Sequence, residues 1–184
     1  MTELLAIGAA LFAGALGGYL LARRSRIGRR EERPDAVHRI LLPFTGTEIS
    51  RRALDAALRL SSAENATLMP AYLATVPKRL PLDCAIPRQA GQAMPILEAI
   101  EQRATAQHVP VDARIERGRS YRHALARLLE TEQVDRVVVP ATATGSKGLS
   151  GDDLVWLLDR APAEVAILRP ARTDRLRVTA QAGL

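Results

Sequence analysis

The uncharged stretch Leu4–Ala22 is the feature that most limits what this chain can fold into. Its sequence, LLAIGAALFAGALGGYLLA, contains neither a charged residue nor a proline. At about 1.5 Å per residue, a helix of this length measures roughly 28 Å, close to the hydrocarbon thickness of a bilayer. Such a helix also satisfies its own backbone hydrogen bonds in lipid. The run therefore predicts a single transmembrane helix within residues 1–22.

Basic residues follow this run at once and set its expected orientation. Five arginines stand there: Arg23, Arg24, Arg26, Arg29 and Arg30. Short basic flanks stay on the cytoplasmic side of a membrane. We therefore expect the N-terminus outside, a basic juxtamembrane linker at residues 23–37, and a cytoplasmic domain after it.

Three other interpretations of the run were weighed against a span. A cleaved signal peptide carries its basic residues before the apolar run, whereas here Glu3 precedes the run and the arginines follow it. A buried core helix or an interfacial helix usually shows a polar face, and Tyr19 is the only polar side chain of this run. A membrane span remains the favoured interpretation.

Small residues form a stripe on one side of the predicted span. Ala10, Gly14 and Gly18 recur every four residues, a spacing that lets two spans approach closely. Spans that never pair carry such stripes too. Dimerisation through this face therefore stays open.

The positive charge of the chain is concentrated at its ends. The net charge is +6 over 184 residues, yet residues 38–170 carry 17 Lys and Arg against 15 Asp and Glu. Part of the excess lies in a basic C-terminal tail, residues 171–184, where anionic lipid head groups would attract it. A nearly neutral domain without a basic stripe argues against nucleic-acid binding. The single cysteine, Cys84, excludes an internal disulfide and suits a reducing cytoplasm.

Beyond the linker, strand-like and helix-like segments alternate along the chain. The predicted strands are residues 38–44, 66–73, 109–116, 134–140 and 164–169, and the predicted helices are 47–62, 89–108, 120–132 and 152–160. Alternation predicts a parallel sheet, and apolar runs such as VVV and ILL suit strands covered on both faces. We therefore predict a three-layer α/β domain with five parallel strands over residues 38–170.

Two details of this pattern can be tested directly. The periodicity of the first predicted helix places five residues on its core face: Ile49, Ala53, Ala56, Ala57 and Leu60. The proline-bearing segment 74–90 is predicted to be a long loop, where function or mobility often resides.

Two blocks near the ends of this domain resemble a known family. ILLPFTGTEISRRALDAALRLSS, residues 40–62, resembles the opening strand, turn and helix of the universal stress protein family, usually written ILVPVDGSxxSxxALxxAxxLA. VVVPATATGSKGLSG and DRAPAEVAILRP, residues 137–151 and 159–170, resemble the closing block of that family. The resemblance spans residues 38–170, with a weaker match in the middle.

The resemblance implies a fold, an assembly and a ligand. The fold is a Rossmann-like sheet of the adenine nucleotide alpha hydrolase type, and dimerisation commonly uses the fifth strand, which here contains Val165 and Ile167. One branch of the family binds ATP with an Asp after the first strand and a G-x-x-G-x9-G-[ST] motif around the phosphates. Glycines let backbone N–H groups approach oxyanions, and the last pair opens a helix whose positive end faces them.

The candidate nucleotide-binding residues lie in two loops. They are Thr45, Gly46 and Thr47 after the first strand, and Gly145, Ser146, Lys147, Gly148 and Gly151 after the fourth. Thr45 stands where the ATP-binding branch has its Asp, and Leu158 and Asp159 stand where its Gly-Ser/Thr pair belongs. Asp152 and Asp153 would repel a triphosphate. We therefore expect no required cofactor, although a phosphate-binding use of the loop stays open beside its interpretation as an ordinary connection.

The other chemistry-bearing residues do not form a recognisable site. His38, His108 and His123 lack metal-ligand spacing, and no metal is expected. Ser120 is predicted to cap a helix, Trp156 to lie in the core, and Cys84 to be inert. The arginines at one strand end could meet an anion but more commonly form a solvated cluster: Arg117, Arg119 and Arg122.

Two functional hypotheses follow from these observations. The first is a membrane-anchored regulatory or interaction module without catalytic activity, dimeric through its last strand and working near a membrane protein. The second is a sensor that binds ATP or a smaller adenine nucleotide through its degenerate glycine-rich loop. An enzyme ranks below both, because these residues assemble no nucleophile, base and oxyanion site.

Overall fold

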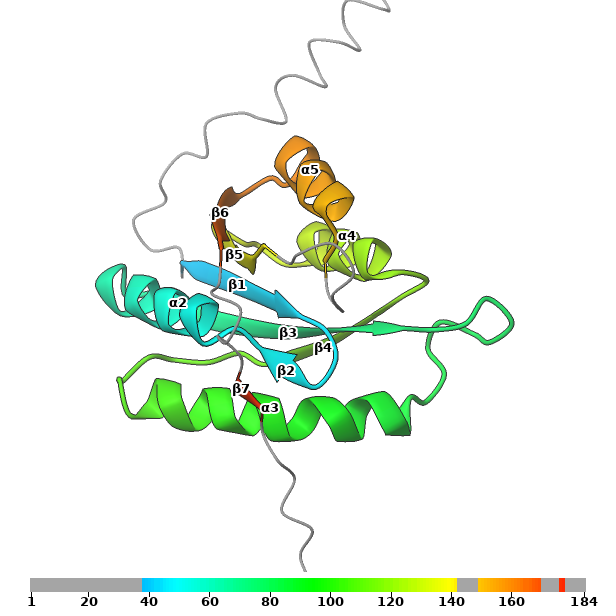
Figure 1. Cartoon of the computed structure of the whole chain (residues 1–184), viewed down its shortest axis with the longest axis horizontal. Helices are drawn as coiled ribbons and strands as arrows, with labels where there is room; N and C mark the ends of the chain where they lie inside the picture. Colours follow the sequence, from blue (N-terminus) through cyan, green and yellow to red (C-terminus); the bar gives the residue numbers. More distant parts are fainter. Residues whose placement is uncertain (1–37, 142–148, 170–175, 178–184) are drawn as a thin grey trace, which may run out of the picture. The chain divides into compact units, whose positions relative to one another are not determined.

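A five-stranded parallel sheet forms the centre of the domain. The computed structural model describes residues 38–141, 149–169 and 176–177, and the chain divides into two units after Ala36. All strand pairs of this sheet are parallel, which confirms the predicted fold class. In spatial order the strands are β4 (Arg114–Gly118), β3 (Thr67–Thr75), β1 (Arg39–Phe44), β5 (Arg136–Pro140) and β6 (Glu164–Leu168), as seen in Figure 1.

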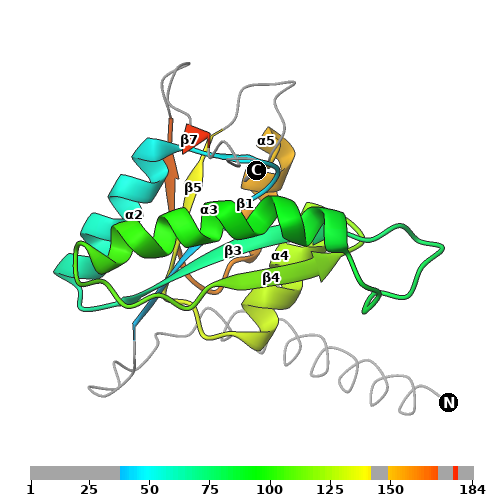
Figure 2. The ribbon, with the colours of Figure 1, turned by 90° about the horizontal axis from the view of Figure 1, so that it is seen from below.

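Helices cover both faces of the sheet and complete three layers. The helices are α2 (Arg51–Ala63), α3 (Pro87–Thr105), α4 (Tyr121–Thr131) and α5 (Gly151–Arg160). Helices α2 and α3 pack on one face of the sheet, and α4 and α5 pack on the other (Figure 2). From β1 the chain first forms β3 and β4 on one side, and it then returns to form β5 and β6 on the other side. The direction in which strands are added therefore reverses between β1 and β5. Ligands of open α/β sheets usually bind at such a reversal, beyond the carboxyl ends of the strands.

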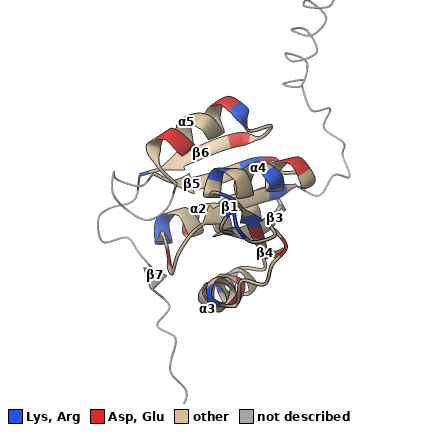
Figure 3. Cartoon of the chain, turned by 90° about the vertical axis from the view of Figure 1, so that its right-hand side faces the viewer, with Lys and Arg blue, Asp and Glu red and all other residues tan. Residues whose placement is uncertain are grey.

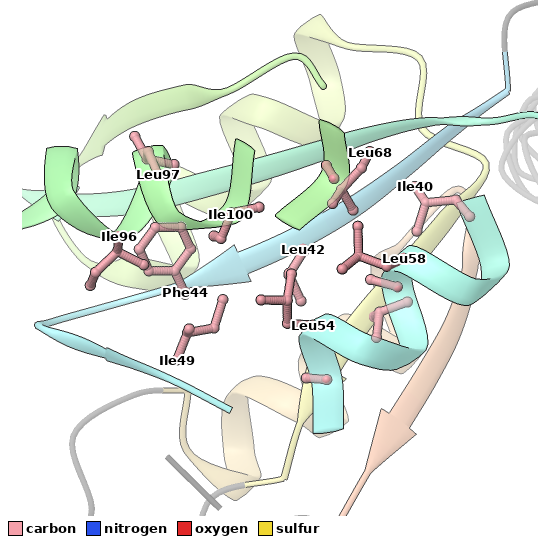
Figure 4. Close-up of a cluster of buried hydrophobic side chains, with 14 of the residues drawn as sticks. Ile40, Leu42, Phe44, Ile49, Leu54, Leu58, Leu68, Ile96, Leu97 and Ile100 are labelled. Carbon is pink, nitrogen blue, oxygen red and sulfur yellow. The ribbon is translucent and has the colours of Figure 1, made fainter. Parts of the chain in front are cut away.

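Alternation along the strands divides the core into two clusters. In β1, Ile40 and Leu42 point to the α2–α3 side, whereas Leu41 points to the α4–α5 side. Figure 4 shows the first cluster, in which side chains of α2 and α3 meet those of β1 and β3. All of these side chains are buried. The apolar runs of the sequence are thus explained by strands with two covered faces.

The first helix differs from its prediction in both start and face. It begins at Arg51 because the hydroxyl of Ser50 accepts a hydrogen bond from the Ala53 amide at 3.2 Å and caps the helix there. Its buried face consists of Ala53, Leu54, Ala57, Leu58 and Ser61. Ala56 and Leu60, which were predicted to lie on that face, are only partly buried, and Leu60 packs against the margin of the core cluster. Ile49 is buried, but it precedes the helix.

Two connections also differ from the sequence-based bounds. The third predicted strand begins at Arg114 rather than Val109, and before it Val111 forms only an isolated parallel bridge with Leu68. The predicted loop 74–90 is shorter, spanning residues 76–86, since β3 continues to Thr75 and Pro87 opens α3.

A short antiparallel pair joins distant parts of the sequence. Strand β2 (Glu48–Ile49) pairs with β7 (Leu176–Arg177), with Glu48 opposite Arg177 in the register. This pair could not be predicted from the sequence, because two-residue strands carry no periodicity. It brings part of the predicted C-terminal tail beside the segment that follows β1.

Arg136 forms ion pairs at the amino-terminal ends of strands β5 and β6. Its guanidinium pairs with Glu64 at the end of α2 and with Glu164 of β6, the latter at 2.6 Å. Hydrogen bonds to Glu164 and then Glu64 raise the pKa of Arg136 above its ordinary value. Ion pairing thus fixes the edge strand β6 to its neighbours.

The predicted membrane span lies outside the described residues. Within the ranges that the structure describes, none of the helices has the length and apolar character needed to cross a bilayer. The described helices belong to the domain that follows Ala36.

Candidate functional site

The turn after β1 holds the first three candidate residues. Thr45 is buried, with 8% of its surface exposed, and Gly46 has a φ of +72° that a side chain would disfavour. Thr47 leads directly into β2. The turn therefore lies at the carboxyl end of β1, next to the sheet reversal, as predicted. It presents hydroxyl and backbone groups there instead of a carboxylate.

Only the last residue of the second candidate loop can be placed. Gly145, Ser146, Lys147 and Gly148 lie outside the described residues. Gly151 is the first residue of α5, and a Cβ built on it meets nothing within 4 Å. Gly151 therefore begins a helix and is not required by a close contact within the described part of the domain.

The start of α5 is closed by a reciprocal cap. Ser150 Oγ accepts a hydrogen bond from the Asp153 amide at 3.2 Å, and the Asp153 carboxylate accepts one from the Ser150 amide at 2.9 Å. The two residues thus form a capping box. Partial burial raises the pKa of Asp153, but hydrogen bonds from Ser150 and the Arg122 guanidinium outweigh it, and the pKa lies below its ordinary value. Asp153 is thus an ionised structural group.

Arg122 connects α4 to this cap. Its guanidinium pairs with Asp153 at 3.1 Å and lies 5.7 Å from the ring centroid of Trp156. Trp156 is partly buried and packs against the second core cluster, in agreement with the predicted core position. The sequence does not reveal this contact because Arg122, although singled out, lies more than 30 positions from Asp153 and Trp156.

The other two arginines of this group hold the loop 76–86. Arg119 Nη1 donates to the carbonyl oxygens of Pro77 at 2.6 Å and Leu80 at 2.8 Å. Arg117 Nη1 donates to the Asp83 carbonyl oxygen at 3.2 Å. The three arginines are therefore occupied by intramolecular contacts rather than forming the solvated cluster that we considered the commoner outcome.

Gly118 and Ser120 shape the turn from β4 into α4. A Cβ on Gly118 would stand 2.3 Å from the backbone nitrogen of Ala124, so only glycine fits. Ser120 Oγ accepts from the His123 amide at 3.2 Å, which confirms the predicted cap. His123 Nδ1 in turn accepts from the Arg119 amide at 3.0 Å. The turn is thus a structural element built from close packing and caps.

The His, Cys and acidic residues of the described ranges were the candidates for a metal site. Among them, no three His, Cys, Asp or Glu side chains gather in a way that could hold a metal ion. Of the histidines, His38 lies 3.8 Å from Asp135 and His123 belongs to the turn above. Cys84 is a partly buried thiol without a disulfide partner. The carboxyl edge therefore offers hydroxyl and backbone groups suited to binding.

Exposed apolar side chains occur on the edge strand β6 and on the helix α5 that precedes it. Among the described strands β6 pairs only with β5, so its outer edge has no strand partner within the ranges that the structure describes. Ile167 on this strand is 39% exposed, and two residues of α5, which leads into it, are more exposed: Val155 at 68% and Leu158 at 59%. Large exposed apolar side chains beside an open strand edge are typical of an interface.

The model of the universal stress protein family matches residues 36–169. The chain belongs to the universal stress protein family. The match covers the whole sheet and its four helices and ends directly after β6. No curated protein matches this chain.

Solved universal stress proteins share the fold of this domain. UspA from Lactobacillus plantarum is 19% identical, covers 73% of this chain and 100% of its own, and has a TM-score of 0.55. A universal stress protein in complex with cAMP is 22% identical over 74% of this chain and 100% of its own, also with a TM-score of 0.55. A family member from Arabidopsis thaliana with AMP bound is 11% identical over 73% and 93%, with a TM-score of 0.52. At these identities the likeness is one of fold.

Proposed function

We propose that this universal stress protein domain is a regulatory interaction module without catalytic activity, dimeric through β6. The proposal rests on the exposed Ile167 side chain of the edge strand β6, together with the exposed Val155 and Leu158 of the preceding helix α5. A second copy would extend the sheet across that edge and bury these side chains. The arginines and the acidic residue at the carboxyl edge are meanwhile used in internal contacts, which leaves few groups for chemistry.

The oligomeric state of the domain tests this proposal. Both core clusters lie between Ile40 and Leu168, so a fragment that begins at Pro34 retains the whole core. Multi-angle light scattering of this fragment is expected to give twice the monomer mass. A mass equal to one chain across micromolar concentrations would contradict the dimer.

The proposal includes a membrane tether. Support comes from the uncharged run Leu4–Ala22 and the arginines after it, which would place the domain on the cytoplasmic side. A dimeric module held at the inner leaflet would act on a membrane-protein partner rather than on a diffusing substrate. Carbonate extraction of membranes and protease accessibility of the domain test the tether and its orientation.

A second candidate function is adenine-nucleotide sensing. It is favoured by two relatives in the comparison, one solved with cAMP and one with AMP, and by the turn Thr45–Thr47 at the sheet reversal. Glycine and hydroxyl groups suit a nucleotide without a triphosphate better than ATP, because Asp152 remains exposed at the start of α5.

Calorimetry separates the two candidates. The fragment from Pro34 is titrated with MgATP, AMP and cAMP, and the Lys147→Ala variant serves as the test of the glycine-rich loop. The interaction-module proposal expects no heat at micromolar concentrations. Micromolar binding that is lost in Lys147→Ala would establish the sensor instead.

A further inference from the structure

A hollow on the surface lies between α2 and the carboxyl end of β6. It has a volume of about 310 Å³ and shares no residue with the turn after β1 or the cap of α5. Its lining consists of Arg52, Asp55, Ala56, Arg59, Leu168 and Arg169. The hollow is therefore distinct from the candidate nucleotide site.

The lining is strongly basic. Three of its six residues are arginines, and its one carboxylate, Asp55, accepts from Arg103 Nη1 of α3 at 3.4 Å. Arg52 takes part in another interaction, so the uncompensated charge of the lining comes from Arg59 and Arg169. On α4 and α5, both acidic and basic segments are present (Figure 3).

Two of the arginines are available for a ligand. Arg59 and Arg169 are exposed, and neither forms an ion pair with another residue of the described ranges. By contrast, Arg117, Arg119 and Arg122 all bind carbonyl or carboxylate groups of the domain. Unpaired guanidinium groups that face one hollow repel one another, and an anion between them relieves that repulsion.

The geometry of the hollow suits a compact, multiply charged anion. Arg52 and Arg59 lie seven residues apart, two turns on the same side of α2, and Ala56 between them leaves space because its side chain is a methyl group. Leu168 gives the hollow a partly buried apolar wall. The planar fork of a guanidinium matches the oxygen atoms of a phosphoryl group through paired hydrogen bonds.

We propose that this hollow binds a phosphoryl group through Arg59 and Arg169, with Arg52 beside them. The group belongs either to a small phosphorylated compound or to a phosphodiester lipid head group, since both present the same oxygen atoms to guanidinium. The site is exposed, so its affinity falls as salt rises.

Calorimetry of the full chain tests the site with two soluble probes. Inorganic pyrophosphate represents a phosphorylated small molecule, and glycerophosphoglycerol represents a lipid head group. The double variant Arg59→Gln/Arg169→Gln is expected to weaken binding of the preferred probe at least tenfold. The control Arg79→Gln/Arg88→Gln removes the same charge from two other exposed arginines and is expected to leave binding within twofold.

The outcomes decide both the site and its ligand. Binding of pyrophosphate alone supports a soluble ligand, and binding of glycerophosphoglycerol supports a lipid head group. In either case the binding must be lost in Arg59→Gln/Arg169→Gln and kept in the control variant. Absence of heat with both probes, or an equal loss in both double variants, would overturn the proposal. The proposal would also be overturned if AMP displaced the probe and Arg59→Gln/Arg169→Gln had no effect on probe binding. The probe would then occupy the candidate nucleotide site instead of the hollow. If the fragment from Pro34 binds no nucleotide, the results expected for pyrophosphate and glycerophosphoglycerol at the hollow stay the same.

Discussion

Arg122 and Asp153 join α4 to the first turn of α5: Nε and Nη2 of Arg122 each lie 3.1 Å from Oδ1 of Asp153. The same carboxylate closes the capping box with Ser150. One side chain therefore fixes the helix start that follows the glycine-rich segment and links it to the neighbouring helix. This contact explains why the acidic residues of the segment are structural.

Asp153→Asn is expected to lower the free energy of unfolding by about 1 kcal/mol, because it weakens the cap and removes an ion pair that is partly exposed. Urea denaturation of the fragment from Pro34 measures this change. Asp152→Asn is the matched control, since Asp152 is exposed and precedes the capping residue. An equal loss in both variants would contradict the role assigned to Asp153.

The stability that Asp153 provides is expected to depend on pH in acid. Its folded-state pKa lies below that of the unfolded chain, which is about 3.9 for an Asp. The unfolded state therefore takes up the proton first, and the stabilisation is complete above about pH 4 and is lost as the pH falls through the lower, folded-state value. Urea denaturation of wild type and Asp153→Asn from pH 7 to pH 2.5 should show a constant difference that shrinks below pH 4. A difference that shrinks between pH 7 and 5 would contradict this assignment.

Gly118→Ala is expected to destabilise the domain by about 2 kcal/mol, as overpacking of a close contact does. The new Cβ would stand 2.3 Å from the Ala124 nitrogen and 2.7 Å from the Ser120 carbonyl oxygen, both of them backbone atoms. Gly151→Ala serves as the control because nothing lies within 4 Å of its Cβ, and it should leave stability unchanged or slightly raised. Thermal unfolding of the two variants checks the contrast. Similar melting temperatures would show that the turn relaxes.

Arg119→Gln is expected to release the loop 76–86. The substitution removes donors to the carbonyl oxygens of Pro77 and Leu80, and the loop carries trypsin sites at Lys78 and Arg79. Tryptic cleavage at these two sites should be several-fold faster than in wild type. Arg114→Gln at the start of β4 is the control, since Arg114 pairs with Asp112 and Glu132 instead. Unchanged cleavage in Arg119→Gln would show that other contacts hold the loop.

Ile167→Lys is expected to dissociate the proposed dimer by placing a charge at the edge of β6. Leu80→Lys is a closely matched control, because Leu80 is 42% exposed and Ile167 is 39% exposed, whereas Leu80 lies in the loop 76–86. Light scattering should give the monomer mass for Ile167→Lys alone. A dimer that survives Ile167→Lys would place the interface elsewhere.

The fold followed from the sequence because its signals are local. Runs such as ILL and VVV recur at strand positions, and Ser120 and Asp153 form caps with residues only three positions away. The contacts that sequence could not give join distant segments: Arg122 with Asp153, Arg119 with Pro77, and β2 with β7. The error in the face of α2 has a similar origin, since the packing of α2 on the sheet and α3 buries Leu54 and Leu58 in preference to Ala56 and Leu60.

The candidate site was foreseen in part. Thr45, Gly46 and Thr47 lie at the carboxyl end of β1 as expected, and Gly151 begins α5, whereas the residues Gly145–Gly148 lie outside the described ranges. Nucleotide binding by this chain therefore stays a prediction. Arg117 and Arg119 bind backbone carbonyl groups, which a sequence does not reveal as partners. Arg122 pairs with the Asp153 carboxylate, 31 positions away.

The central claim is that this universal stress protein domain works at a membrane, held by the run Leu4–Ala22. Ultracentrifugation of detergent-free lysates, with the chain lacking residues 1–33 as control, tests it most directly. The account predicts that the full chain sediments with membranes, resists carbonate and is released by detergent, while the shortened chain stays in the supernatant. Recovery of the intact full chain in the supernatant beside the control would contradict it.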